Sequence, residues 1–279
     1  MGLFEKITNY ETDFTTYGLT FENYKWYKPL LIAILTTVFY LIFSGVIIGL
    51  FMATGLYPSN DMTILMILTV LSVIIFIPSL YISIKIVRDR ALSTYLTQNA
   101  KWNWSIYIKT FAITLVIYLI VSVITALIEK KPINNTLTII TFLTVLILTP
   151  IQCFAEELLC RGFFMQAFGS WFKIPVVAII LQAIVFSILH VNFSLAFYYF
   201  LIIGFTLGVI TWYSKGLETS SAIHAVNNLS SFVLAGLGLG SSSGAMGIYD
   251  LIYSIIVIFV TLIAIVAIEK KFKWFGFDF

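Results

Sequence analysis

Long runs of apolar residues, separated by short polar stretches, cover most of the chain after residue 29. A helix that crosses a bilayer needs about 20 predominantly apolar residues, since each residue rises about 1.5 Å. In the first half and at the end of the chain the runs are 30–56, 62–84, 110–128 and 248–268. Between residues 136 and 239 they follow closely, at 136–172, 175–193, 195–213 and 220–239. This pattern predicts an all-α, polytopic integral membrane bundle of about eight transmembrane helices.

The positions of the basic residues predict how this bundle is oriented. Short cytoplasmic loops of membrane proteins collect lysine and arginine. With both termini in the cytoplasm, all but two of the 16 lysines and arginines fall in cytoplasmic segments, and the exceptions are Lys130 and Lys131. The charge distribution therefore supports eight spans with both termini in the cytoplasm.

The amino-acid composition is that of a membrane protein, and it also indicates which kinds of partner the protein has. The chain is 60% hydrophobic and 10% charged, whereas soluble domains carry about 25% charged residues. The partner of most of the surface is therefore the lipid bilayer, and a net charge of +3 predicts no nucleic-acid partner.

The predicted organisation is one helical membrane domain with four consecutive parts. The first 29 residues are polar and of mixed charge, which is unlike a cleavable signal peptide. We expect a cytoplasmic or interfacial segment, N-terminal helices, a core that holds the chemistry, and a last helix with a basic tail, at residues 1–29, 30–135, 136–240 and 241–279.

Ionisable residues inside apolar runs are concentrated in the second half of the chain. Such residues are costly in a membrane and indicate function by default. Both histidines of the chain belong to this group, which also contains two glutamates, an arginine and an asparagine: Glu156, Glu157, Arg161, His190, His224 and Asn228.

The first motif is Glu156-Glu157 followed by Arg161. Residues four apart share a helix face, so Glu157 and Arg161 can pair. Glu156 is rotated by about 100° and is free to face another helix, which suits a general base. The alternative is that both glutamates are solvated structural residues at the cytoplasmic end of a span.

The other two motifs each place a histidine one helical turn from a second residue. Phe186 precedes His190, and His224 precedes Asn228, whereas Asn227 projects elsewhere and suits helix–helix hydrogen bonding. Taken singly, each pattern is also typical of structural polar residues between membrane helices. Three such patterns in neighbouring spans favour a single functional site.

The ordered set Glu-Glu-x-x-x-Arg, Phe-x-x-x-His and His-x-x-x-Asn resembles the CAAX-protease and bacteriocin-processing (Abi) family. These are intramembrane endopeptidases related to the type II prenyl-protein CAAX protease. The resemblance covers roughly residues 150–230. It implies that Glu156 and His190 activate a water, that His224 and Asn228 stabilise the oxyanion, and that Glu157, Arg161 and Phe186 support them.

Metal dependence is open at this point. The chain lacks the His-Glu-x-x-His helix of common zinc proteases. A single Zn²⁺ bound by Glu156, His190 and His224 remains an alternative to a glutamate-type mechanism without metal.

The predicted spans place two of the site residues at different depths. His190 falls near the outer end of its helix, whereas Glu156 approaches the cytoplasmic end of the preceding one. Two shifts of the helix boundaries would bring them together. The fourth helix would run from about residue 143 to 168, and the fifth would continue past 193 towards 200.

The resemblance implies a protease of membrane-associated substrates, either a CAAX-type prenylated protein or a leader or pheromone peptide. Two other classes compete with it, a non-catalytic bacteriocin immunity or scaffold protein and a small transporter. Transporters usually carry matched halves, and no such symmetry is visible. The family and the abundance of Ile, Phe, Lys and Asn predict a multi-pass protein of a bacterial plasma membrane.

Overall fold

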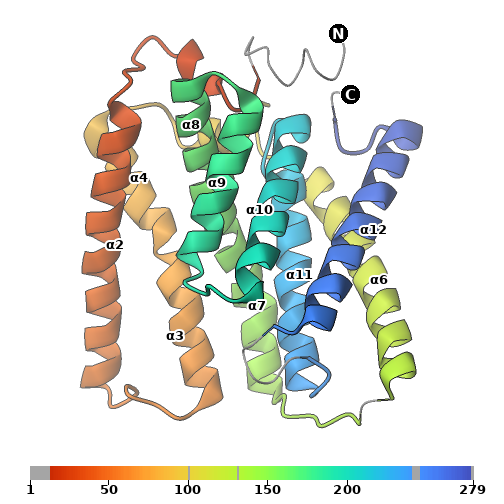
Figure 1. The fold of residues 1–279 in the computed structure, drawn as a ribbon. Helices are drawn as coiled ribbons and strands as arrows, with labels where there is room; N and C mark the ends of the chain where they lie inside the picture. Colours follow the sequence, from red (N-terminus) through yellow and green to blue (C-terminus); the bar gives the residue numbers. More distant parts are fainter. Residues whose placement is uncertain (1–12, 100, 131, 241–245, 278–279) are drawn as a thin grey trace.

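The computed structural model describes residues 13–99, 101–130, 132–240 and 246–277, and these parts fold as a bundle of helices (Figure 1). The first half contains η1 (Tyr17–Thr20), α2 (Lys28–Ala53), α3 (Met62–Ile74), α4 (Phe76–Val87), α5 (Ser93–Leu96) and α6 (Trp104–Glu129). The second half contains α7 (Ile139–Glu157), η2 (Leu158–Phe164), α8 (Met165–Phe172), α9 (Pro175–Leu189), α10 (Leu195–Ser214), α11 (Glu218–Gly236) and α12 (Ile248–Phe272).

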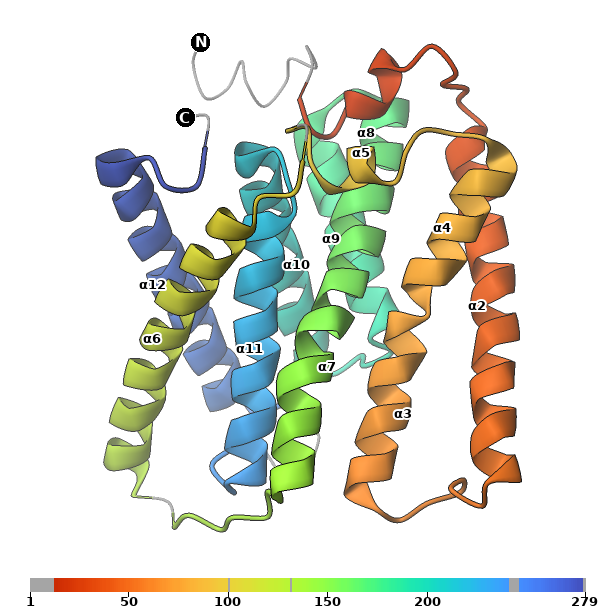
Figure 2. The ribbon, with the colours of Figure 1, turned by 180° about the vertical axis from the view of Figure 1, so that it is seen from behind.

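Six helical runs of the described residues are long and apolar enough to cross a membrane. They are α2, α3 with α4, α6, α7 with η2 and α8, α10, and α12, and α9 is a shorter apolar helix. The prediction of an all-α, multi-pass membrane protein is therefore confirmed. The remaining predicted span, 220–239, corresponds to α11, which runs between the long helices (Figure 2).

Helix α11 is the central helix of the second half. It packs against α6, α7 and α10, and all ten residues from Glu218 to Asn227 are buried. Its sequence is much more polar than that of the other long helices. Because neighbouring helices shield it from lipid, its polar side chains can find partners inside the protein.

The helix that carries the glutamates is continuous over 34 residues, from Ile139 to Phe172. It contains Pro150, and directly after Glu157 it changes from an α-helix to the π-helix η2. Gly162 lies in η2, where a Cβ atom would be only 2.8 Å from the Tyr95 carbonyl oxygen. A larger residue would therefore push η2 away from the α4–α6 connection that covers it.

The hairpin of α9 and α10 is shorter than its neighbours. Helix α9 ends at Leu189, and Val191 follows with a left-handed φ of 48°. The predicted helix 175–193, and its extension towards residue 200, are therefore too long. Figure 1 shows that this hairpin turns before it reaches the level where α2, α3 and α7 end. The η1 segment and the C-terminal end of α12 lie at the opposite end of the bundle (Figure 1).

Candidate active site

Glu156 lies close to the middle of the continuous helix α7–η2–α8. His190 follows the last residue of the short helix α9. The long helix and the early end of α9 bring the two residues together, with 3.9 Å between His190 Nε2 and Glu156 Oε2. Neither of the two boundary shifts considered from sequence occurs: the fourth helix keeps nearly its original limits, from Ile139 to Phe172, and α9 ends before residue 193.

Glu157 and Arg161 form the predicted i,i+4 ion pair, which is completely buried. Arg161 Nη1 lies 2.9 Å from Glu157 Oε1, and both side chains are 0% exposed. Arg161 also donates to the Gly204 carbonyl oxygen at 3.3 Å, and its guanidinium lies 4.3 Å from the centre of the Phe186 ring. Buried charges are tolerated only when partners of this kind surround them.

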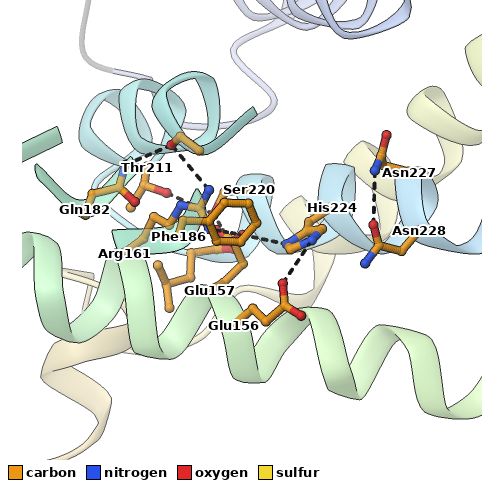
Figure 3. A network of polar contacts seen from close by, with 12 residues as sticks. Glu156, Glu157, Arg161, Gln182, Phe186, Thr211, Ser220, His224, Asn227 and Asn228 are labelled. Carbon is orange, nitrogen blue, oxygen red and sulfur yellow. Dashed lines mark hydrogen bonds and ion pairs between the residues drawn. The ribbon is translucent and has the colours of Figure 1, made fainter. Parts of the chain in front are cut away.

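The same carboxylate also orients His224. Its Nδ1 lies 2.8 Å from Glu157 Oε1 (Figure 3). An ionised carboxylate can accept hydrogen bonds but cannot donate them. His224 Nδ1 therefore carries the proton in this hydrogen bond. The Nε2 atom of His224 is therefore directed towards Glu156, whose Oε2 lies 3.5 Å away.

Glu156 is held differently from Glu157. Gln152, one turn earlier on α7, donates from Nε2 to Glu156 Oε1 at 2.7 Å. Glu156 Oε2 is buried and receives no hydrogen bond from the described residues. It is also the oxygen that faces the Nε2 atoms of His190 and His224.

His190 is fixed by its helix and by two aromatic rings. Its Nδ1 lies 2.8 Å from the Phe186 carbonyl oxygen, which can only accept, so Nδ1 donates. The imidazole stacks on Phe200 with 3.8 Å between ring centres, and it contacts the Phe186 ring at 4.6 Å. Both histidines therefore present Nε2 to the same oxygen of Glu156.

Asn228 follows His224 by one turn of α11, and its neighbour Asn227 belongs to a separate polar network. Asn227 is bonded to Tyr118 on α6 and to Tyr199 on α10, as expected for a helix–helix hydrogen-bonding residue. It also donates to Asn228 Oδ1 at 3.1 Å (Figure 3).

A cavity of about 290 Å³ connects these residues on the side of the α9–α10 hairpin. Glu156 does not itself line the cavity, and its Oε2 reaches the cavity through the two imidazoles. The lining includes polar side chains from α7, α11 and the residue after α9, and aromatic rings from α9, α10 and α11: Gln152, His190, His224, Asn227, Asn228, Phe186, Tyr199, Phe200 and Phe232.

Glu156, His190 and His224 are the side chains that could bind a metal ion at this site. Two imidazole nitrogens and one carboxylate oxygen are suitable donors for zinc. Yet within the described ranges, no group of three or more His, Cys, Asp or Glu side chains could hold a metal ion as placed. The zinc alternative at Glu156, His190 and His224 thus gains no support from geometry.

Sequence reasoning missed two contributors to this site. Gln152 lies four residues before Glu156, so the helical spacing could have indicated it. Phe200 could not have been found this way, because its stacking on His190 depends on the tight turn between α9 and α10.

Comparisons with known proteins cover this part of the chain. Residues 135–230, which contain all three motifs, match the family model described as Type II CAAX prenyl endopeptidase Rce1-like. The chain is also 28% identical over 169 residues to the uncharacterized protein YyaK of Bacillus subtilis (strain 168). That alignment covers 55% of each chain, so the chain spans about half the length of this curated relative. No solved structure matches the chain.

Proposed function

We propose, from the premise that residues 135–230 form a domain of the Rce1-like CAAX protease family, that this protein is an intramembrane endopeptidase. The observation that carries the proposal is the convergence of two imidazole Nε2 atoms on one oxygen of Glu156, at 3.5 and 3.9 Å. This oxygen receives no hydrogen bond from the described residues, and the two imidazoles that face it line a cavity of about 290 Å³.

In this mechanism, Glu156 is the general base. A water that is hydrogen-bonded to Glu156 and His190 gives a proton to the carboxylate while its oxygen attacks the carbonyl carbon of the peptide. When the tetrahedral intermediate collapses, the carbon–nitrogen bond breaks and the same proton passes from Glu156 to the leaving amine. The products are a carboxylic acid and an amine, and no further reactant is consumed.

His224 and Asn228 stabilise the charge that develops on the carbonyl oxygen. Donors aimed at such an oxyanion lower the barrier because they are already in place when the charge appears. For His224 to donate from Nε2, the ring must carry both protons. The carboxylate of Glu157 accepts the hydrogen bond from Nδ1 and so holds the ring with Nε2 directed towards Glu156.

The substrates that fit this proposal are membrane-associated peptides. The cavity offers aromatic walls from Phe186, Phe200 and Phe232 beside its polar groups, and both peptide backbone and apolar side chains can bind such a surface. A CAAX-type prenylated protein and a leader or pheromone peptide both meet this description.

The test is cleavage of quenched fluorescent peptides, prenylated and plain, by purified wild type and Glu156→Gln. We expect the substitution to lower kcat by about 10²- to 10⁴-fold, the usual contribution of a positioned general base. Glu22→Gln makes the same chemical change at an exposed residue of the N-terminal segment and serves as the control. A parallel arm with a chelator separates a zinc mechanism, which stops, from a glutamate–water mechanism, which continues.

Equal cleavage by wild type and a folded Glu156→Gln would show that Glu156 is not the base. If wild type cleaves no peptide in the panel while it binds one, the immunity or scaffold alternative is favoured instead.

A further inference from the structure

A buried network of two tyrosines and one asparagine ends on the proposed oxyanion donor. The Tyr118 hydroxyl donates to Asn227 Oδ1 at 2.9 Å. Asn227 Nδ2 donates to the Tyr199 hydroxyl at 2.8 Å and to Asn228 Oδ1 at 3.1 Å. Tyr118, Tyr199 and Asn227 are all less than 10% exposed, so water competes little for these bonds.

The bond between the two asparagines is unusual for a helix. Side chains of adjacent helical residues point about 100° apart and do not normally meet. Here Asn227 is held by α6 and α10, on both sides of α11, and its second amide hydrogen is left to bond Asn228. The contact is therefore imposed by three helices and not by local sequence.

This contact decides which end of the Asn228 amide faces the substrate. The terminal torsion of an asparagine is broad and roughly two-fold, so the amide can turn by 180° at little cost. With Oδ1 bonded to Asn227, the Nδ2 group of Asn228 is the donor, and it also contacts the Cys153 side chain on α7. Nδ2 carries two hydrogens, so one of them can still serve the cavity that Asn228 lines. A turned amide would present an oxygen to the oxyanion and repel it.

We propose that Asn227, fixed by Tyr118 and Tyr199, is a positioning residue that holds the Asn228 amide with its donor directed at the oxyanion. The inference rests on the proposed function, because it assigns a role to the donor that the function requires. Asn227 itself makes no contact with the reacting atoms in this scheme.

The kinetic test is a double-mutant cycle on a peptide that wild type cleaves. We expect Asn227→Ala to lower kcat by about 10- to 100-fold with little change in KM, because a misplaced donor acts mainly on the transition state. Tyr118→Phe should act in the same direction and less strongly. In an Asn228→Ala background, Asn227→Ala should cause no further loss, since nothing remains to be positioned.

Tyr253→Phe is the matched control. Its hydroxyl joins α12 to α6 through Ser122 at 3.2 Å, and its ring packs against the cluster that contains Tyr118. Among the described residues, this hydroxyl has no hydrogen bond to Tyr118 or Asn227. We expect it to retain the kcat of wild type. Equal losses from Asn227→Ala in the two backgrounds would overturn the inference, and so would an unchanged kcat in Asn227→Ala.

A second measurement does not depend on turnover. Nitrogen-15 relaxation of the Asn228 side-chain amide, assigned by its loss in Asn228→Ala, reports its motion on the picosecond to nanosecond timescale. We expect a rigid amide in wild type and in Tyr253→Phe, and a mobile one in Asn227→Ala. An amide that is equally rigid in Asn227→Ala overturns the inference. Absence of any cleavage by wild type would refute the proposed function, and the relaxation result would still decide whether Asn227 holds Asn228.

Discussion

At the scale of single residues, the two adjacent glutamates have opposite surroundings. Glu157 is completely buried and shares one oxygen between Arg161 and His224. Glu156 keeps one oxygen on Gln152 and turns the other towards the histidines. Glu157 is thus paired with a buried cation, whereas Glu156 is bonded to a neutral amide and faces the two imidazoles, as the proposed division between support and base requires.

This difference predicts a large structural effect at Glu157. Removal of its charge by Glu157→Gln leaves Arg161 buried without a counter-ion, which we expect to destabilise the protein by about 3–5 kcal/mol. The double variant Glu157→Gln/Arg161→Met should recover part of this loss, because no buried charge is then unpaired. Unfolding by denaturant in detergent micelles measures the free energy of unfolding of both variants. A Glu157→Gln variant as stable as wild type would show that the pair does not hold the helices together.

At the scale of helices, apolar length predicted most elements, and contacts between elements set the rest. The limits of α2 and α12 lie within four residues of their predicted apolar runs. Helix α6 instead begins six residues before its run, at Trp104, where Asn103 caps it. The end of α9 and the π-helix η2 were not predictable in this way. Both depend on neighbours: η2 on the Tyr95 carbonyl above Gly162, and the tight hairpin on the packing of α9 against α10.

The same dependence explains why the depth conflict between Glu156 and His190 could not be resolved from sequence. The structure brings together three residues named from the motifs, Glu156, His190 and His224, and their roles stay predictions. The partners supplied by other helices, such as Tyr118 for Asn227, leave no local pattern in the chain.

Helices α9 and α10 are in close contact at Gly204, so a larger side chain there should lower the stability of the protein. A Cβ at this position would lie 3.1 Å from Ala183 Cα, so Gly204→Val should separate the helices and destabilise the protein by about 1–3 kcal/mol. Gly45→Val in α2 is the matched control, since no atom lies within 4 Å of its added Cβ. Thermal unfolding in detergent compares the two. Equal stability of the two variants would contradict tight packing at Gly204.

At the scale of the whole molecule, the bundle has a basic end and a less basic end. Lysines and arginines lie at the helix ends near η1 and the end of α12, whereas Lys130 lies at the other end, after α6. The positive-inside rule predicts that the basic end faces the cytoplasm.

Cysteine labelling of intact cells checks this orientation. A membrane-impermeant maleimide should label Thr54→Cys, at the exposed end of α2, and should label Glu22→Cys only after permeabilisation. The native Cys153 and Cys160 are buried and should give a low background. The reverse labelling pattern would invert the predicted topology.

The π-helix η2 also fixes the relation between the two halves of the long helix. Hydrogen bonds in a π-helix span five residues instead of four, so the segment holds a residue that a regular α-helix would not accommodate. Loss of one residue between 158 and 164 would therefore restore regular α-helical bonding and leave α8 nearly in phase with Glu156. Gain of one residue would instead turn α8 by about 100° and break its contacts with η1 and α9. This stretch should therefore tolerate the loss of one residue better than the gain of one.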